Sequence, residues 1–351
     1  MPIGQEVTEV RPNHRFDESR LEHYMRERMP ELRGTFRVAQ FLAGQSNPTF
    51  MVSLGDARFV MRKKPSGVLL QSAHQVEREY RIITALVNTE VPVPRTRMLC
   101  EDSGVIGTPF FIMDYVEGRI FADPLLPECS REERAAIYDS MNDTMARLHR
   151  VDYKAVGLDD YGRPEAYVAR QISRWTKQYH AAITDRPIPE MEYLIDWLPK
   201  HMPSEDETAI AHGDFRIGNL IVHPREPRII AVLDWELSTL GHPLADLAWN
   251  CLSYHYPAGL EDTTSFQNID LDVVGIPTEE DYLASYCRRV GRPSVSDFIF
   301  FVVFALFRGA SIAQGIAYRA KMGNASAPDA ELRGKRAAVS ARVACDLARR
   351  V

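Results

Sequence analysis

Cysteine is scarce in this chain and never occurs in closely spaced pairs. The 351 residues include five cysteines, more than twenty residues apart, and no C-x-x-C pair. This pattern indicates neither a zinc knuckle nor a disulfide framework. A reduced, cytoplasmic compartment is therefore the expected location. The first twenty residues contain no apolar stretch, so we expect no signal peptide.

Long hydrophobic runs are also missing. The longest apolar run, FIFFVVFALF, covers residues 298–307, whereas a membrane-spanning helix needs about twenty residues. We therefore expect a buried core helix here and no membrane association. The formal net charge of −6 argues mildly against nucleic-acid binding. With 45% hydrophobic and 26% charged residues, the chain has the composition of a globular protein. It is long enough for two domains of ordinary size.

Several familiar chemical motifs are absent. No two glycines are spaced G-x-G, and the patterns G-x-x-x-x-G-K-[ST], H-E-x-x-H and G-x-S-x-G do not occur. These absences exclude the dinucleotide fingerprint, the P-loop, the zinc-protease motif and the nucleophile elbow. Any nucleotide or catalytic site in this chain must therefore use another pattern.

The first third of the chain alternates apolar and polar residues and is rich in β-branched and aromatic ones. Five stretches predict strands: 36–44, 48–55, 58–64, 96–102 and 109–116. Helices are expected over 17–29 and about 70–88. From about residue 130 the pattern is mostly helical, except for a β-rich island at 208–235. The order predicts a sheet with one main helix, a linker at 115–118, and then a helical half.

The octapeptide HGDFRIGN, residues 212–219, lies between two apolar runs of that island. Phosphoryl transfer needs mainly positioning and charge neutralisation: an aspartate for the attacking hydroxyl, and an amide and a second aspartate for Mg²⁺. Asp214 is followed by Asn219 at +5, and Asp234 ends the apolar run IIAVL. A spacing of D-x-x-x-x-N alone is weak, but with the hairpin that follows it is specific. The alternative is a solvated turn.

Seven segments together resemble the aminoglycoside phosphotransferase (APH) and choline kinase branch of the protein-kinase-like fold. They resemble most the subgroup related to the kinase-like domains joined to acyl-CoA dehydrogenases. The segments are GQSNPTF, FVMRKKP, EREYRI, FFIMDYVEG, HGDFRIGNL, VLDWE and GHPLADLAW. The resemblance implies an α+β bilobal fold. The N-lobe, 1–116, would hold a five-stranded sheet with one main helix, and the C-lobe, 117–351, would be mostly helical.

The resemblance also implies roles by position. Asp214 would be the catalytic base, and Asn219 and Asp234 would hold the Mg²⁺ that accompanies ATP. Arg216 lies where protein kinases carry a lysine near the γ-phosphate, so we expect it to stabilise the transferring charge. A surface salt bridge is the alternative for Arg216. His212 and Asp246 are expected to brace the loop rather than react, and Glu236 is left unassigned.

Further positions would bind the nucleotide. The stretch GQSNPTF would cover its phosphates through Gly44, Gln45, Ser46 and Asn47, and the backbone at Asp114 and Val116 would meet the adenine. Arg62 takes the position of the phosphate-binding lysine on the third strand. Of two glutamates on the next helix, Glu79 lies closer to the apolar stripe and is chosen as its partner, with Glu77 solvated. A solvated basic cluster is the alternative for Lys63 and Lys64.

Two departures from protein kinases bear on the substrate. Gly213 replaces the arginine of H-R-D, and no D-F-G or A-P-E segment is present, so a small hydroxylated molecule is expected rather than a protein. Basic residues in the helical stretches 164–200 and 280–350 suit a phosphorylated or carboxylated acceptor: Arg170, Arg174, Lys177, Arg308, Arg319 and Lys321. For each of these, a solvated helix face is the alternative.

The leading hypothesis is an ATP- and Mg²⁺-dependent small-molecule O-phosphotransferase, and a hydroxyacyl-CoA is one candidate acceptor. The competing acceptors are another hydroxylated metabolite or an aminoglycoside. The hypothesis from another class is a nucleotide-binding pseudokinase, which the replacement of lysine by Arg62 favours. Against it stands the presence of Asp214, Asn219 and Asp234 together. The sequence leaves the oligomeric state and the choice between ATP and GTP open.

Overall fold

The structure of the chain is a computed structural model that describes residues 6–42, 47–65, 75–260, 263–322 and 330–351. The chain forms two compact units, each built from two separated segments. Unit 1 comprises residues 1–122 and 217–238, and unit 2 comprises residues 123–216 and 239–351. The boundary between an N-lobe and a C-lobe at residue 116 stays a prediction. The segment 217–238, expected in the C-lobe, clusters with unit 1.

Unit 1 is built on an antiparallel sheet in the order β1-β2-β3-β4-β6-β5. Its strands are β1 (Val7–Thr8), β2 (Phe36–Phe41), β3 (Thr49–Leu54), β4 (Ala57–Lys63), β5 (Thr96–Cys100) and β6 (Phe110–Asp114). Strands β2 to β6 are the five predicted from the sequence. The sequence does not predict β1, because two residues carry no alternation signal.

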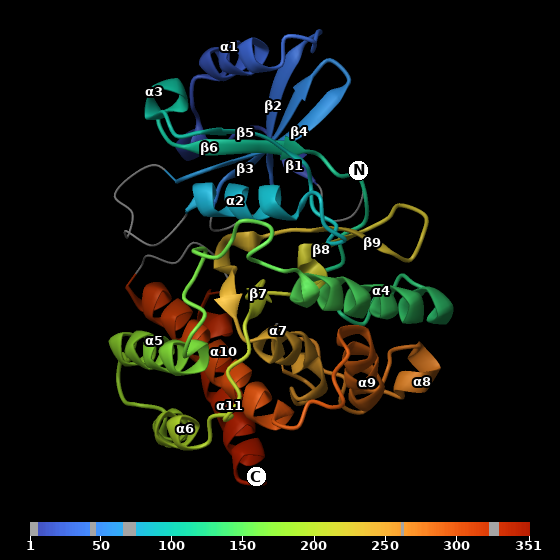
Figure 1. The fold of residues 1–351 in the computed structure, drawn as a ribbon. Helices are drawn as coiled ribbons and strands as arrows, with labels where there is room; N and C mark the ends of the chain where they lie inside the picture. Colours follow the sequence, from blue (N-terminus) through green and yellow to red (C-terminus); the bar gives the residue numbers. More distant parts are fainter. Residues whose placement is uncertain (1–5, 43–46, 66–74, 261–262, 323–329) are drawn as a thin grey trace. The chain divides into compact units, whose positions relative to one another are not determined.

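Helices cover both faces of this sheet (Figure 1). They are η1 (Pro12–His14), α1 (Glu18–Arg28), α2 (Val76–Leu86) and α3 (Ser103–Ile106). Successive residues of β6 point to opposite faces. The ring centres of Phe110 and Tyr24 of α1 lie 5.6 Å apart, and those of Phe111 and Tyr80 of α2 lie 6.1 Å apart. Helix α1 begins where predicted, because Asp17 accepts the N–H of Arg20 at 3.0 Å as its N-cap.

The second segment of unit 1 is a short ribbon. It consists of η2 (Ile217–Asn219), β8 (Leu220–Val222), β9 (Ile229–Val232) and η3 (Trp235–Leu237), with β8 antiparallel to β9. Backbone bonds tie it to the first segment: the N–H of Val232 donates to the carbonyl of Pro92 at 2.9 Å, and Arg119 bridges to Val222. These bonds explain why residues far along the chain belong to unit 1.

Unit 2 is mostly helical. Its helices are α4 (Arg131–Arg150), α5 (Tyr167–Ala181), α6 (Pro189–Lys200), α7 (Pro243–Asn250), η4 (Cys251–Tyr254), α8 (Leu271–Val274), α9 (Glu279–Val290), α10 (Phe298–Lys321) and α11 (Ala330–Ala348). Strands β7 (Ala209–Ala211) and β10 (Thr239–Gly241) pair antiparallel, with Ala211 opposite Thr239. Strand β7 leads directly into the octapeptide, and β10 leads into α7.

Helix α10 contains the apolar run that the sequence singles out. By length and composition alone it could cross a membrane, but 72% of its most apolar window is buried inside the structure. This burial agrees with the expected core helix. Its one charged residue within the apolar half, Arg308, is only 7% exposed, and its surroundings are described below.

Candidate functional site

In unit 1, Arg62 joins two carboxylates that come from different segments of the chain. Its Nε lies 3.1 Å from Oε2 of Glu79 on α2, and its Nη2 donates to Oδ1 of Asp234 at 3.1 Å. The Glu79 side chain is 1% exposed and that of Arg62 is 11% exposed. Among the described atoms, neither Nε of Arg62 nor Oε2 of Glu79 has an aligned hydrogen bond, so the contact between them is ionic. The predicted Arg62–Glu79 pair is therefore present, and its role in nucleotide binding stays a prediction.

The electrostatics of this cluster favour a further cation. Burial raises the pKa of Glu79 to about 7, although Arg62 opposes that rise. Burial alone would lower the pKa of Arg62, but Glu79, Asp234 and Glu236 raise it above its ordinary value. One ligand oxygen from each of these three carboxylates lies within 4.8 Å of the other two. A single arginine does not neutralise three carboxylates, and oxygen ligands of this kind suit Mg²⁺.

The two predicted metal ligands of unit 1 lie at one end of the β8–β9 ribbon. The N–H of Leu233 donates to the carbonyl of Asn219 at 2.8 Å, which continues the ladder beyond the Leu220–Val232 pair. Asp234 follows at once, in the left-handed region with φ 66° and ψ 56°. That conformation is uncommon outside glycine and turns the chain sharply after β9. Asn219 is 5% exposed, and Glu236, left unassigned by the sequence, belongs to the carboxylate cluster.

The structure describes only part of the predicted nucleotide site. Gly44, Gln45 and Ser46 lie outside the described residues. Asn47 is buried, and its amide donates to Oε1 of Glu79 at 3.4 Å, so the end of the GQSNPTF stretch contacts the Arg62 cluster.

At the predicted hinge, one backbone donor is already used. The N–H of Asp114 donates to the carbonyl of Arg95 at 2.8 Å, and the Asp114 carboxylate binds Arg97. If Asp114 meets adenine, its carbonyl must be the group that does so. Val116 stays a predicted adenine contact.

The alternative that Lys63 belongs to a solvated basic cluster is wrong. Lys63 and Arg62 are consecutive residues of β4 and therefore point to opposite faces of the sheet. Lys63 is 1% exposed, its Nζ lies 5.8 Å from the centre of the Phe16 ring, and burial lowers its pKa. Lys64 is partly exposed and pairs with Glu77 at 2.8 Å. Of the consecutive residues Arg62 and Lys63, Arg62 is thus the one that faces α2, where it meets Glu79.

In unit 2, Asp214 stands on a loop of residues 212–216, which we call the HGDFR loop. Its Oδ1 accepts the indole N–H of Trp249 at 2.8 Å, and its Oδ2 accepts from Nε of Arg216 at 3.3 Å. The Asp214 side chain is 19% exposed and that of Arg216 is 53% exposed. An exposed ion pair with Asp214 is compatible with both roles given for Arg216, which are a contact with the γ-phosphate and a surface salt bridge.

The HGDFR loop is braced from beneath by Asp246. Its carboxylate accepts the backbone N–H groups of His212 at 2.5 Å and Gly213 at 2.8 Å. Burial alone would raise the pKa of Asp246. The hydrogen bond and charge of His149, with smaller contributions from His212 and the Gly213 N–H, lower it below its ordinary value. His212 is buried and its Nδ1 accepts the N–H of Asp214 at 3.1 Å, so both residues have the bracing contacts expected of them.

Glycine at position 213 has a local physical reason. Its φ is +84°, in the left-handed region that other residues adopt only with strain. The carbonyl of Gly213 accepts from Nη2 of Arg308. The arginine of H-R-D could not be introduced here without changing the path of the loop.

The sequence misses Trp249 and misplaces Arg308. For Arg308 the sequence offers either an acceptor contact or a solvated helix face, but its guanidinium is buried and lies 4.4 Å from the ring centre of Trp249 and 5.5 Å from that of Trp175. The expected brace at Asp246 already brings α7 to the HGDFR loop, but no local signal in the sequence indicates that Trp249 reaches Asp214 or that α10 meets the loop. For the other basic candidates, a solvated helix face stays the alternative to an acceptor contact. Lys321, for example, forms an exposed ion pair with Asp185.

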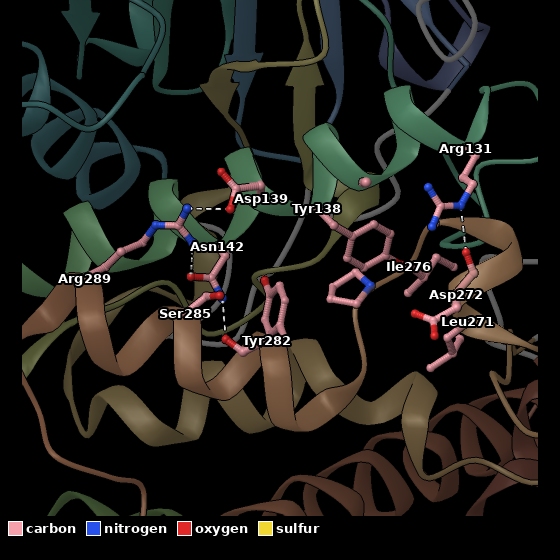
Figure 2. A pocket seen from close by; sticks show the side chains of 13 residues that line it. Arg131, Tyr138, Asp139, Asn142, Leu271, Asp272, Ile276, Tyr282, Ser285 and Arg289 are labelled. Atoms are coloured by element: carbon pink, nitrogen blue, oxygen red, sulfur yellow. Dashed lines mark hydrogen bonds and ion pairs between the residues drawn. The ribbon is translucent and has the colours of Figure 1, made fainter.

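Unit 2 also contains a cavity of about 220 Å³ between α4, α8 and α9 (Figure 2). Its polar groups are largely engaged with one another. Arg289 donates to Asp139 and Asn142, and Nε of Arg131 donates to the carbonyl of Asp272. The cavity lining includes none of the predicted site residues.

Comparison with known proteins relates both units to one family. The profile of the phosphotransferase enzyme family (APH) matches residues 37–272. Mouse acyl-CoA dehydrogenase family member 10 is 48% identical over 90% of this chain, which spans 29% of that protein. Rat acyl-CoA dehydrogenase family member 11 is 42% identical over 100% of this chain, which spans 45% of it. The chain therefore corresponds to less than half the length of these relatives.

Solved structures share the fold. A crystal structure from Ralstonia eutropha JMP134, with the provisional name aminoglycoside phosphotransferase, is 46% identical with a TM-score of 0.87 and covers 96% of this chain and 99% of its own. Choline kinase from Cryptosporidium parvum Iowa II is 14% identical with a TM-score of 0.66 over 95% of this chain and 97% of its own. Aminoglycoside phosphotransferase APH(4)-Ia, in a complex with ADP and hygromycin B, is 15% identical with a TM-score of 0.57. The match covers 92% of this chain and 98% of the APH(4)-Ia chain. The predicted α+β kinase-like fold is confirmed.

Proposed function

We propose that this chain, which belongs to the phosphotransferase enzyme family (APH), moves the γ-phosphate of ATP to the hydroxyl of a small molecule. The observation that carries the proposal is the cluster in unit 1, where three carboxylates surround Arg62. Such a cluster costs stability, because like charges repel one another and burial disfavours their charged forms. It suits a site that receives Mg²⁺ together with the phosphates of a nucleotide. The nucleotide in the APH(4)-Ia complex supports the use of ATP.

In the proposed reaction, the hydroxyl oxygen forms a bond to the γ-phosphorus while the bond to the β–γ bridging oxygen breaks. Asp214 orients the hydroxyl and accepts its proton, and Arg216 stabilises charge on the transferring group. Asn219 and Asp234 would hold Mg²⁺, which when bound neutralises phosphate charge. Arg62 would bind phosphate. The chain links Asp214 to Asn219 through only four residues.

We further propose a hydroxyacyl-CoA as the acceptor. The names of the relatives that match nearly the whole chain include acyl-CoA dehydrogenases, although the chain matches only part of each. The competing acceptors are other hydroxylated metabolites and aminoglycosides. A phosphate-rich thioester would also give the basic residues of α5, such as Arg170 and Arg174, a role.

The proposal is tested in two steps. ATP with Mg²⁺ should raise the midpoint of thermal unfolding, and the absence of any shift would overturn the kinase proposal. Turnover is then measured on a panel of hydroxyacyl-CoAs, aminoglycosides and amino alcohols.

Two variants separate the proposed roles. Asp214→Ala should abolish turnover and leave the nucleotide-induced shift largely intact, whereas Asp234→Ala should weaken the shift itself. Activity that survives Asp214→Ala would show that the base is assigned wrongly. A nucleotide-induced shift without turnover on any acceptor would favour the pseudokinase.

A further inference from the structure

One face of α7 contacts successive residues of the HGDFR loop. Asp246, Trp249 and Asn250 are spaced i, i+3 and i+4, so they share a face of the helix. Asp246 accepts the first two backbone N–H groups of the loop, and Trp249 donates to Oδ1 of Asp214 at 2.8 Å. Asn250 donates to the carbonyl of Phe215 at 3.3 Å. Of these contacts, only the Trp249 bond reaches the side chain assigned to proton transfer.

The indole of Trp249 is in turn held by Arg308. The guanidinium stands over the Trp249 ring at 4.4 Å and within 5.5 Å of the Trp175 ring, and it donates to the carbonyl of Gly213. Such cation–π contacts strengthen when they are removed from water. Arg308 is 7% exposed, and its Nε is buried without a hydrogen-bond partner among the described atoms. A group so enclosed can influence Asp214 through the neighbours that it contacts, which are the ring of Trp249 and the carbonyl of Gly213.

We propose that Trp249 is a positioning residue that fixes the rotation of the Asp214 carboxylate, and that Arg308 holds Trp249 in place. This inference rests on the proposed function, which makes Asp214 the proton acceptor. A carboxylate with one oxygen bonded to an indole presents the other in a fixed direction. Misplacing a reacting group by about 1 Å can cost about a hundredfold in rate. The loss of the indole N–H should therefore lower kcat rather than change nucleotide affinity.

The contact itself is tested by NMR on the full chain with ¹⁵N-labelled tryptophan. The four tryptophans give at most four indole N–H signals, and Trp249→Phe identifies the one that belongs to Trp249. Asp214→Ala and Arg308→Met should each shift that signal and leave the signals of Trp197 and Trp235 in place. An unchanged Trp249 signal in Asp214→Ala would overturn the proposal.

Kinetics test whether the contact positions Asp214. Trp249→Phe, which keeps an aromatic ring under Arg308, should lower kcat by about ten- to a hundredfold and leave KM for MgATP unchanged. The rate is followed as ADP released, with water and with the best acceptor of the panel. The matched control is Trp197→Phe, since Trp197 is buried on α6 and stacks on His201 at 4.2 Å. A kcat for Trp249→Phe within twofold of this control would overturn the positioning role.

Arg308→Met should lower kcat in the same way. Its control is Arg134→Met, because Arg134 is also buried and donates to backbone carbonyls at Leu126 and Cys129. Equal kcat losses in the two variants would overturn a specific role of Arg308. A wild-type chain without turnover would overturn the proposed function alone. The indole signal would then still decide whether Trp249 holds Asp214.

Discussion

Among single residues, Arg62 is one whose loss should cost much stability, because Glu79 beside it is almost fully buried. Arg62→Met would leave that carboxylate with only the long contact from Asn47 among the bonds described above. Breaking a buried pair by removing one partner typically costs about 3–5 kcal/mol. We expect a loss of about 3 kcal/mol in the free energy of unfolding, measured by urea denaturation.

The pH dependence of that loss follows from Glu79. Burial raises the pKa of Glu79 to about 7, and Arg62 opposes the rise. A carboxyl group with a raised pKa favours the folded state at low pH, and this contribution is lost as the pH rises through the folded value. The deficit of Arg62→Met should therefore be larger at pH 8 than at pH 6. Lys64→Met is the control, since its partly exposed pair with Glu77 should contribute less than about 1 kcal/mol. Equal losses in the two variants would contradict the argument.

At the scale of an element, helix α7 begins with a histidine that must stay neutral. His242 is its N-cap, 2% exposed, and its Nδ1 accepts the N–H of Leu244 at 3.2 Å. Burial lowers the pKa of His242 to about 4 from an ordinary value of 6.5. A protonated ring would lose the acceptor, so the unfolded chain binds this proton more readily.

The stability that His242 provides should be fully present above pH 6.5 and be lost as the pH falls toward 4. Between pH 7 and pH 5 this loss amounts to roughly 2 kcal/mol. His242→Asn keeps a capping oxygen but does not titrate, so its free energy of unfolding should fall less over that range. Urea denaturation at both pH values measures the difference. Parallel losses in the wild type and the variant would show that His242 is not the group responsible.

Elements also show what local patterns can predict. Strand alternation separates Arg62 from Lys63, and the 100° step of a helix identifies Glu79 rather than Glu77 as the inward glutamate. Both rules are geometric properties of one element and need no knowledge of its neighbours. The burial of Lys63 lies beyond them, because it depends on Phe16 arriving from a segment outside the strand.

The contacts that support Asp214 show what local patterns do not predict. The sequence indicates a loop with Asp214 and a brace at Asp246, because both lie in recognisable motifs. Trp249 and Arg308 carry no such signal: their contacts depend on which faces α7 and α10 present to a loop that is distant in the sequence. Tertiary packing determines which faces the helices present to the loop. No hydrophobic periodicity within one helix reports that packing.

At the scale of the whole molecule, unit 1 is discontinuous. Residues 217–238 belong with residues 1–122, and three features hold the segments together. Backbone bonds join Val232 to Pro92 and Arg119 to Val222, and Arg62 binds Asp234. At Gly118 the contact is so close that an added Cβ would lie 2.5 Å from the carbonyl oxygen of Val222. The sheet and the ribbon should therefore fold as one cooperative unit.

A fragment of residues 1–122 should accordingly fail to unfold cooperatively, because it lacks the partners of Pro92, Arg119 and Arg62. Joining residues 217–238 to it through a Gly/Ser linker of about twenty residues, with a typical reach of about 25 Å, should restore a cooperative transition. Circular dichroism during urea titration measures both. A linked chain carrying a scrambled 217–238 segment controls for added length and composition. Cooperative unfolding of residues 1–122 alone would show that the ribbon is only attached to unit 1, and Arg62 would then need no carboxylate from it to be stably placed.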